Sequence, residues 1–162
     1  LITLMLINDG VLHSCLFYPS FQFKKNRSEY YRQLTSVRER GTYEEWIEFF
    51  CNSLLESAKD SVGSLKNLVD LHNRSTATIT ENLGRTAANG QRLLGILEEH
   101  PIVDTAFIAA QLDIGRSTAS SLVKSFEELG ILRPLDESRQ RYRQYGYEEY
   151  LSILREDAEP IR

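Results

Sequence analysis

The chain has 162 residues, of which 41% are hydrophobic and 26% are charged, and its formal net charge is −4 at pH 7. This composition excludes wholesale disorder and collagen-like or low-complexity proteins, and the length allows one domain or two small ones. The segment up to Ala88 holds 10 basic and 10 acidic residues, so the 9 basic and 13 acidic residues that follow carry the net charge of −4. Neither half has the strongly basic balance of an obligate polyanion binder.

The two cysteines, Cys15 and Cys51, are too few for a disulfide framework and lack the close pairing of zinc ligands. His13 stands two residues before Cys15, but no second pair with metal-ligand spacing follows, so we assign no metal ligand. We therefore expect a reducing compartment and a cytoplasmic protein. The apolar stretch at 1–7 is too short to span a bilayer, and we expect no membrane partner.

The first predicted element is a short helix at 1–7, where six of the seven residues are apolar. Gly10 can adopt the left-handed conformation that ends helices. No Ser, Asp or Asn precedes the stretch to cap it. We expect a buried core helix whose upstream packing partner is absent from this chain.

An aromatic connector at 16–23 contains Pro19, which disfavours helix there. Apolar residues at spacings of three and four then predict a helix over about 21–37, with Gly41 as its end. A second, longer helix is predicted to start after Thr42 and to keep its apolar stripe to about His72.

The segment 75–82 is polar and β-branched, which makes it the weakest helical stretch of the first half. We place the domain boundary near it, giving a helical domain at 1–80 and a second domain at 81–162. The alternative is a bent continuation of the long helix through 83–88.

The second domain has a different pattern, with short helices followed by alternating residues typical of strands. The predicted elements are a helix around 93–97 that stops at His100-Pro101, a helix capped by Asp104 or Thr105, a turn at 113–115, a helix from Ser117 to Gly130, strands at 131–133 and 141–145, and a final helix at 147–154.

This order predicts a mainly α protein whose C-terminal part is a winged helix-turn-helix domain with a small β-hairpin. In DNA-binding domains of this type the third helix enters the major groove and the wing contacts phosphates. The candidate DNA-contact residues are Arg116, Ser117, Thr118, Ser120, Ser121 and Lys124 on the third helix, and Arg133, Arg139, Arg141 and Arg143 in the wing.

The same fold also serves as a protein-interaction or dimerisation module. On the third helix the positive charges of the two basic residues are offset by Glu127 and Glu128, and the second half of the chain as a whole has a net negative charge. Phosphate neutralisation supplies most non-specific DNA affinity, so these charges favour an interaction module over a DNA-binding surface.

Three stretches of the first half carry a resemblance to a known family. Residues 1–12 read LITLMLINDGVL, residues 26–34 read NRSEYYRQL, and residues 41–50 read GTYEEWIEFF. In this order, with an aromatic connector between the first two and a winged helix at the end, they resemble the C-terminal part of Fic-family proteins of one bacterial branch. The resemblance covers nearly the whole chain.

The resemblance implies a protein adenylyltransferase, which transfers AMP from ATP to a hydroxyl of a target protein with Mg²⁺ on the phosphates. The family signature His-Pro-Phe-x-Asp-Gly-Asn-Gly-Arg holds the base, the metal ligand and the phosphate-binding loop. This chain does not contain it, and the family layout places it just before Leu1. We therefore assign no catalytic residue, metal or cofactor to this chain, and expect it to be inactive in AMP transfer by itself.

The resemblance also implies nucleotide-binding positions. The tyrosine pair of the family's second stretch lies near the adenine and corresponds to Tyr30 and Tyr31, and Arg38 stands where relatives place a polar contact, often Asn. The alternative for both tyrosines is simple core packing with their hydroxyls at the surface.

We expect self-association of the chain through an exposed apolar face at 1–23 or through the winged helix. The competing hypothesis for the whole chain is a DNA-binding transcriptional regulator, in which the first half is a helical dimerisation domain and duplex DNA is the partner.

Overall fold

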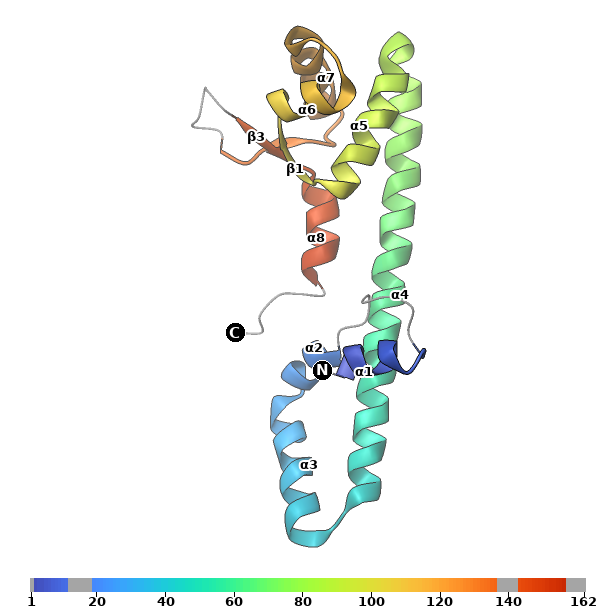
Figure 1. Cartoon of the computed structure of the whole chain (residues 1–162), viewed down its shortest axis with the longest axis vertical. Helices are drawn as coiled ribbons and strands as arrows, with labels where there is room; N and C mark the ends of the chain where they lie inside the picture. The colour runs from blue at the N-terminus through green and yellow to red at the C-terminus, as the bar shows by residue number, and fades with distance from the viewer. Residues whose placement is uncertain (1, 12–18, 137–142, 157–162) are drawn as a thin grey trace. The chain divides into compact units, whose positions relative to one another are not determined.

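A computed structural model describes residues 2–11, 19–136 and 143–156 (Figure 1). The described chain is mainly helical, with three short strands, and none of its helices is both long and apolar enough to cross a bilayer. Two compact units are present, one up to Lys66 and one formed by Asn67–Leu154. This division falls within α4, earlier in the chain than the boundary expected after residue 80.

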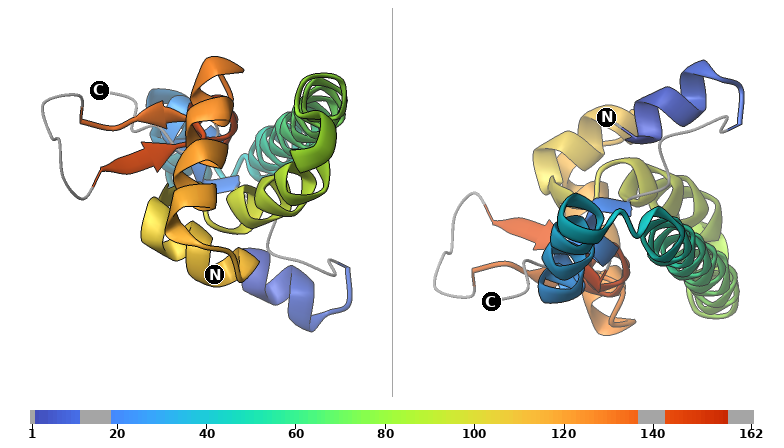
Figure 2. Two further views of the ribbon diagram at one scale, coloured as in Figure 1. Left: turned by 90° about the horizontal axis from the view of Figure 1, so that it is seen from above. Right: turned by 90° about the horizontal axis from the view of Figure 1, so that it is seen from below.

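The N-terminal unit is a set of helices in which α3 and the first part of α4 run side by side as an antiparallel hairpin (Figures 1 and 2). Gly41 makes the turn, with a φ of 69° and an N–H that donates to the Val37 carbonyl, as the sequence predicted. The helices are α1 (Ile2–Asn8), α2 (Pro19–Lys25), α3 (Arg27–Arg40) and α4 (Tyr43–Asn82).

Two expectations for this unit are wrong. Pro19 does not interrupt the helix but begins α2, because a proline in the first turn needs no N–H donor and its φ already suits a helix. The single helix expected over 21–37 is two helices, since the backbone leaves the helical region at Asn26, with φ −105° and ψ 36°.

The long helix α4 ends at Asn82 rather than near His72. The polar segment stays helical because its hydroxyls find acceptors one turn back: the hydroxyl of Thr78 donates to the Arg74 carbonyl at 2.9 Å, and that of Thr80 donates to the Thr76 carbonyl at 2.8 Å. Burial of Ile79 adds tertiary packing that overrides the weak helix propensity.

Apolar burial is sparse in the N-terminal unit. Its described part contains no fully buried large aliphatic or aromatic side chain. Aromatic rings of α2, α3 and α4 contact one another but remain half-exposed, while the buried residues are small or polar: Pro19, Gln22, Ser36, Ser53 and Ser57.

The C-terminal unit follows the end of α4 with short helices around a small sheet (Figure 1). The sheet is antiparallel with strand order β1-β3-β2. Strand β1 was not predicted, because its extended conformation depends on pairing with β3, which is distant in the sequence. The elements are η1 (Gly84–Thr86), α5 (Ala87–Glu99), β1 (Ile102–Asp104), α6 (Thr105–Leu112), α7 (Arg116–Glu128), β2 (Arg133–Pro134), β3 (Gln144–Gly146) and α8 (Glu148–Glu156).

The helix ends of this unit follow predicted signals. The Asp104 carboxylate accepts the Phe107 N–H at 2.8 Å and caps α6. Asp113, with φ 55°, ends α6, and Gly130, with φ 73°, follows α7. The third predicted helix begins one residue early, at Arg116.

A continuous hydrophobic core lies within the C-terminal unit and includes side chains from the end of α4. Tyr147 is among its largest members, 1% exposed, and shares a 2.8 Å hydrogen bond with the Ser75 hydroxyl. Burial raises the pKa of the Tyr147 hydroxyl to about 12. The buried core residues are Leu71, Ile79, Leu93, Leu94, Leu97, Val103, Ile108, Ala109, Leu112, Ala119, Leu122, Val123, Phe126, Ile131, Leu132, Tyr145, Tyr147 and Ile153.

Two glycines of α5 make a matched test of this packing. A Cβ at Gly90 would lie 2.8 Å from Ile79 Cγ2 and 2.8 Å from Leu83 Cδ1, whereas a Cβ at Gly95 meets nothing within 4 Å. We expect Gly90→Ala to lower the free energy of unfolding by ~1–3 kcal/mol through overpacking, and Gly95→Ala to raise it by ~0.5–1 kcal/mol through helix propensity. Urea denaturation of both variants measures this, and equal effects would contradict the described contact of α5 with α4.

Candidate functional site

The outer face of α3 carries two of the three residues that the sequence linked to nucleotide binding, Tyr31 and Arg38. Spacings of three and four place Arg27, Tyr31, Leu34 and Arg38 along one side of α3, and all four are exposed. Tyr31 is 54% exposed, and the guanidinium carbon of Arg27 lies 5.6 Å from the centroid of its ring. We call these four residues the α3 outer face.

Tyr30, the residue before Tyr31, packs against the neighbouring helices of the N-terminal unit. Its ring centroid is 5.5 Å from that of Phe23 and 5.6 Å from that of Trp46, within the aromatic contacts of α2, α3 and α4. The two adjacent tyrosine rings meet edge-on, at 5.5 Å between centroids. Tyr30 thus makes ring contacts within the unit, while Tyr31 is presented outward.

Arg38 shares the exposed face with Tyr31 and has only a loose ion pair, with 3.7 Å between its Nη2 and Glu39 Oε1. An exposed pair at that distance contributes little to stability. The Tyr31 ring has the guanidinium group of Arg27 at 5.6 Å, and the guanidinium group of Arg38 follows two turns along the helix. Such an arrangement suits a planar anionic ligand such as a nucleotide.

Arg27 was not predicted from the sequence as a member of this candidate nucleotide surface. The signal that could have found it is its position four residues before Tyr31 on a predicted helix, which places a cation beside an aromatic side chain.

The described residues contain no candidate metal site, since no group of three or more His, Cys, Asp or Glu side chains among them lies close enough to hold an ion.

The second candidate surface is the solvent face of α7. Four apolar side chains of α7, Ala119, Leu122, Val123 and Phe126, are buried in the core. The opposite side carries every predicted contact residue of the third helix, and each is exposed: Arg116, Ser117, Thr118, Ser120, Ser121 and Lys124.

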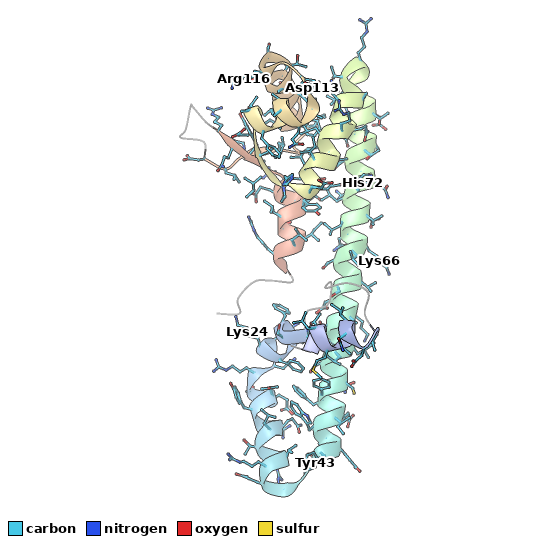
Figure 3. The ribbon with its side chains drawn as sticks, viewed as in Figure 1. Lys24, Tyr43, Lys66, His72, Asp113 and Arg116 are labelled. Atoms are coloured by element: carbon cyan, nitrogen blue, oxygen red, sulfur yellow. The ribbon has the colours of Figure 1, made fainter. Side chains whose placement is uncertain are left out.

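The α7 face is polar but only weakly basic. Figure 3 shows Arg116 at its start, close to the turn at Asp113 that joins α6 to α7. At the other end, Lys124 Nζ lies 3.8 Å from Glu128 Oε1, and both side chains are mostly exposed. The face thus offers hydroxyl donors and acceptors between two cations.

The expected wing is described in part. Arg133 lies on β2 and Arg143 just before β3, and both side chains are exposed. Arg143 has an interaction of its own within the chain. Arg139 and Arg141, also predicted as contact residues, lie outside the described residues.

The two faces of α3 lead to a prediction with two readouts. We expect Tyr31→Ala to raise the Kd for a fluorescent ATP analogue by ~5–10-fold, as loss of an exposed stacking partner should, with unchanged thermal stability. Tyr30→Ala should lower the free energy of unfolding of the N-terminal unit by ~2 kcal/mol, because it removes a half-buried ring. Titration and thermal melting of both variants test this, and unaltered affinity in Tyr31→Ala would remove the α3 outer face as a nucleotide surface.

No model of a known protein family matches the chain. The resemblance to Fic-family proteins stays a prediction that rests on the three quoted stretches, and the winged helix rests on the order of its elements.

Proposed function

We propose that this chain is the C-terminal part of a Fic-type protein adenylyltransferase, a class that transfers AMP from ATP to a hydroxyl of a target protein. The observation that carries the proposal is the order of elements. The stretches at 1–12, 26–34 and 41–50 correspond to α1, to α3 and to the start of α4, and helices and strands in the order of a winged helix follow.

Within that proposal the contribution of this chain is limited and specific. The α3 outer face would hold the base end of ATP, with Tyr31 against the ring and the guanidinium groups of Arg27 and Arg38 beside it. The phosphates, Mg²⁺ and the catalytic base belong to the signature loop, which this chain does not contain. The proposal includes a cytoplasmic location, which the small number of cysteines supports.

The test is to read the coding sequence directly upstream of Leu1 and to assay the full reading frame for AMP transfer from labelled ATP to protein. We expect the codons of His-Pro-Phe-x-Asp-Gly-Asn-Gly-Arg just before Leu1 and activity that is lost on replacement of the signature His by Ala. A start codon or an unrelated sequence at that place would refute the proposal.

A second candidate function, binding of duplex DNA by the C-terminal unit, is favoured by one observation. All six predicted contact residues of α7 are exposed on one helix, and α5, β1, α6, α7, β2 and β3 follow in the order of a winged helix. Protein interaction through the same face is the alternative that the acidic balance of the second half supports.

We expect DNA binding, if it is the function, to depend on both cations of α7. The Arg116→Ala/Lys124→Ala double variant should then bind duplex DNA at low salt at least ~10-fold more weakly, with the slope of log K against log salt reduced by ~2. Arg92→Ala, an exposed arginine of α5, is the control and should bind as the parent does. Fluorescence anisotropy at several salt concentrations gives both values, and absence of binding by the parent chain at low salt excludes this function.

A further inference from the structure

Positive charge gathers on helices α2 and α3 of the N-terminal unit. The first half of the chain is neutral as a whole, so its charge is unevenly distributed. All the basic side chains of the two helices are exposed. Between Pro19 and Arg40 six basic residues stand against two acidic ones: Lys24, Lys25, Arg27, Arg32, Arg38 and Arg40 against Glu29 and Glu39.

Both acidic residues of these helices already have a basic partner. The Glu29 carboxylate accepts from Arg32 Nε at 2.8 Å and from Arg32 Nη2 at 2.6 Å. The Glu39 carboxylate forms the loose pair with Arg38 described above. None of the carboxylates that the structure describes pairs with Lys24, Lys25 or Arg27. These three cations are therefore available to an anionic partner.

The three cations lie at the junction of α2 and α3. Lys24 and Lys25 end α2, and Arg27 begins α3. The acidic first turn of α4 follows Tyr43, and Figure 3 shows Lys24 and Tyr43 at opposite ends of α3. The basic end of the hairpin is thus separated from its acidic end. At 0.1 M salt charges are screened over ~10 Å, so a partner at the junction responds to the local cations and not to the net charge of the chain.

The length of this surface indicates an extended ligand. The α3 outer face continues from the junction, with Tyr31 one turn after Arg27 and Arg38 two turns further on. With a rise of 1.5 Å per residue, Arg27 and Arg38 are ~16 Å apart along the helix axis. A ligand that contacts Lys24 and Arg38 together must be extended and carry several negative charges. Between them the Tyr31 ring, 54% exposed, offers a face for a planar group.

We propose that Lys24, Lys25 and the α3 outer face bind single-stranded nucleic acid. The phosphates of the strand pair with the lysines and with the guanidinium groups of Arg27 and Arg38, and one base stacks on Tyr31. A duplex keeps its bases stacked and paired, and an acidic peptide has no base, so the exposed ring favours a single strand. The proposal does not rest on adenylyltransferase activity, although ATP and the strand would compete for Tyr31.

The first test measures the electrostatic part with the whole chain and a fluorescein-labelled oligothymidylate. We expect Lys24→Ala/Lys25→Ala to raise the Kd at low salt by ~10-fold and to reduce the slope of log K against log salt by ~1.4, because two phosphate contacts are lost. The control, Arg85→Ala/Arg92→Ala, removes two exposed cations of the C-terminal unit and should bind as the parent does. Equal weakening in both variants, or no binding by the parent at low salt, would overturn the proposal.

The second test isolates stacking on the Tyr31 ring. We expect Tyr31→Ala to raise the Kd for the oligothymidylate by ~5–10-fold with an unchanged salt slope, because a base contact is lost and no phosphate contact. Tyr43→Ala, which removes another exposed tyrosine of the same hairpin, is the control and should bind as the parent does. Anisotropy titrations give both values, and thermal melting checks that the variants are folded.

Two results of these titrations would contradict a single-stranded nucleic acid as the partner. One is parental affinity for the oligothymidylate in Tyr31→Ala. The other is displacement of the labelled strand by polyglutamate as readily as by unlabelled oligothymidylate at equal charge. Either result would make the surface a general polyanion site, open to acidic peptides, in which the ring has no part.

Discussion

The uneven burial of apolar side chains is the constraint on which the rest of the structure depends. The end of α4 supplies Leu71 and Ile79 to the core of the C-terminal unit, where both are almost fully buried. In the described part of the N-terminal unit, by contrast, large side chains such as Leu55 and Val62 remain half-exposed. Since apolar burial is the main favourable term in folding, the C-terminal unit has its own source of stability and the N-terminal unit has far less.

The geometry of the two candidate binding surfaces, on α7 and on α3, follows from this division. In the C-terminal unit the buried side of α7 fixes the helix, so its hydroxyl-rich outer side is held in place by the core. In the N-terminal unit the aromatic contacts hold Tyr30 inward and thereby turn Tyr31 outward beside Arg27. Each unit thus presents one polar surface whose geometry depends on the packing behind it.

Sequence patterns predicted the parts of this architecture that depend on local chemistry. Caps and left-handed residues at Gly41, Asp104 and Gly130 lie where they were expected, because each satisfies backbone groups within its own turn. The end of α4 and strand β1 were not predictable in the same way, since burial of Ile79 and pairing of β1 with β3 depend on residues far away in the chain. For the candidate nucleotide surface, the sequence could name Tyr30 and Tyr31 but not which of the two faces outward.

The most direct test of this division is hydrogen exchange of the whole chain. We expect the amides of α5 and α7 to show strong protection and the amides of 47–65 in α4 to show much weaker protection. Equal protection of both units would contradict it, because the N-terminal unit would then be as stable as the C-terminal unit despite its sparse apolar burial.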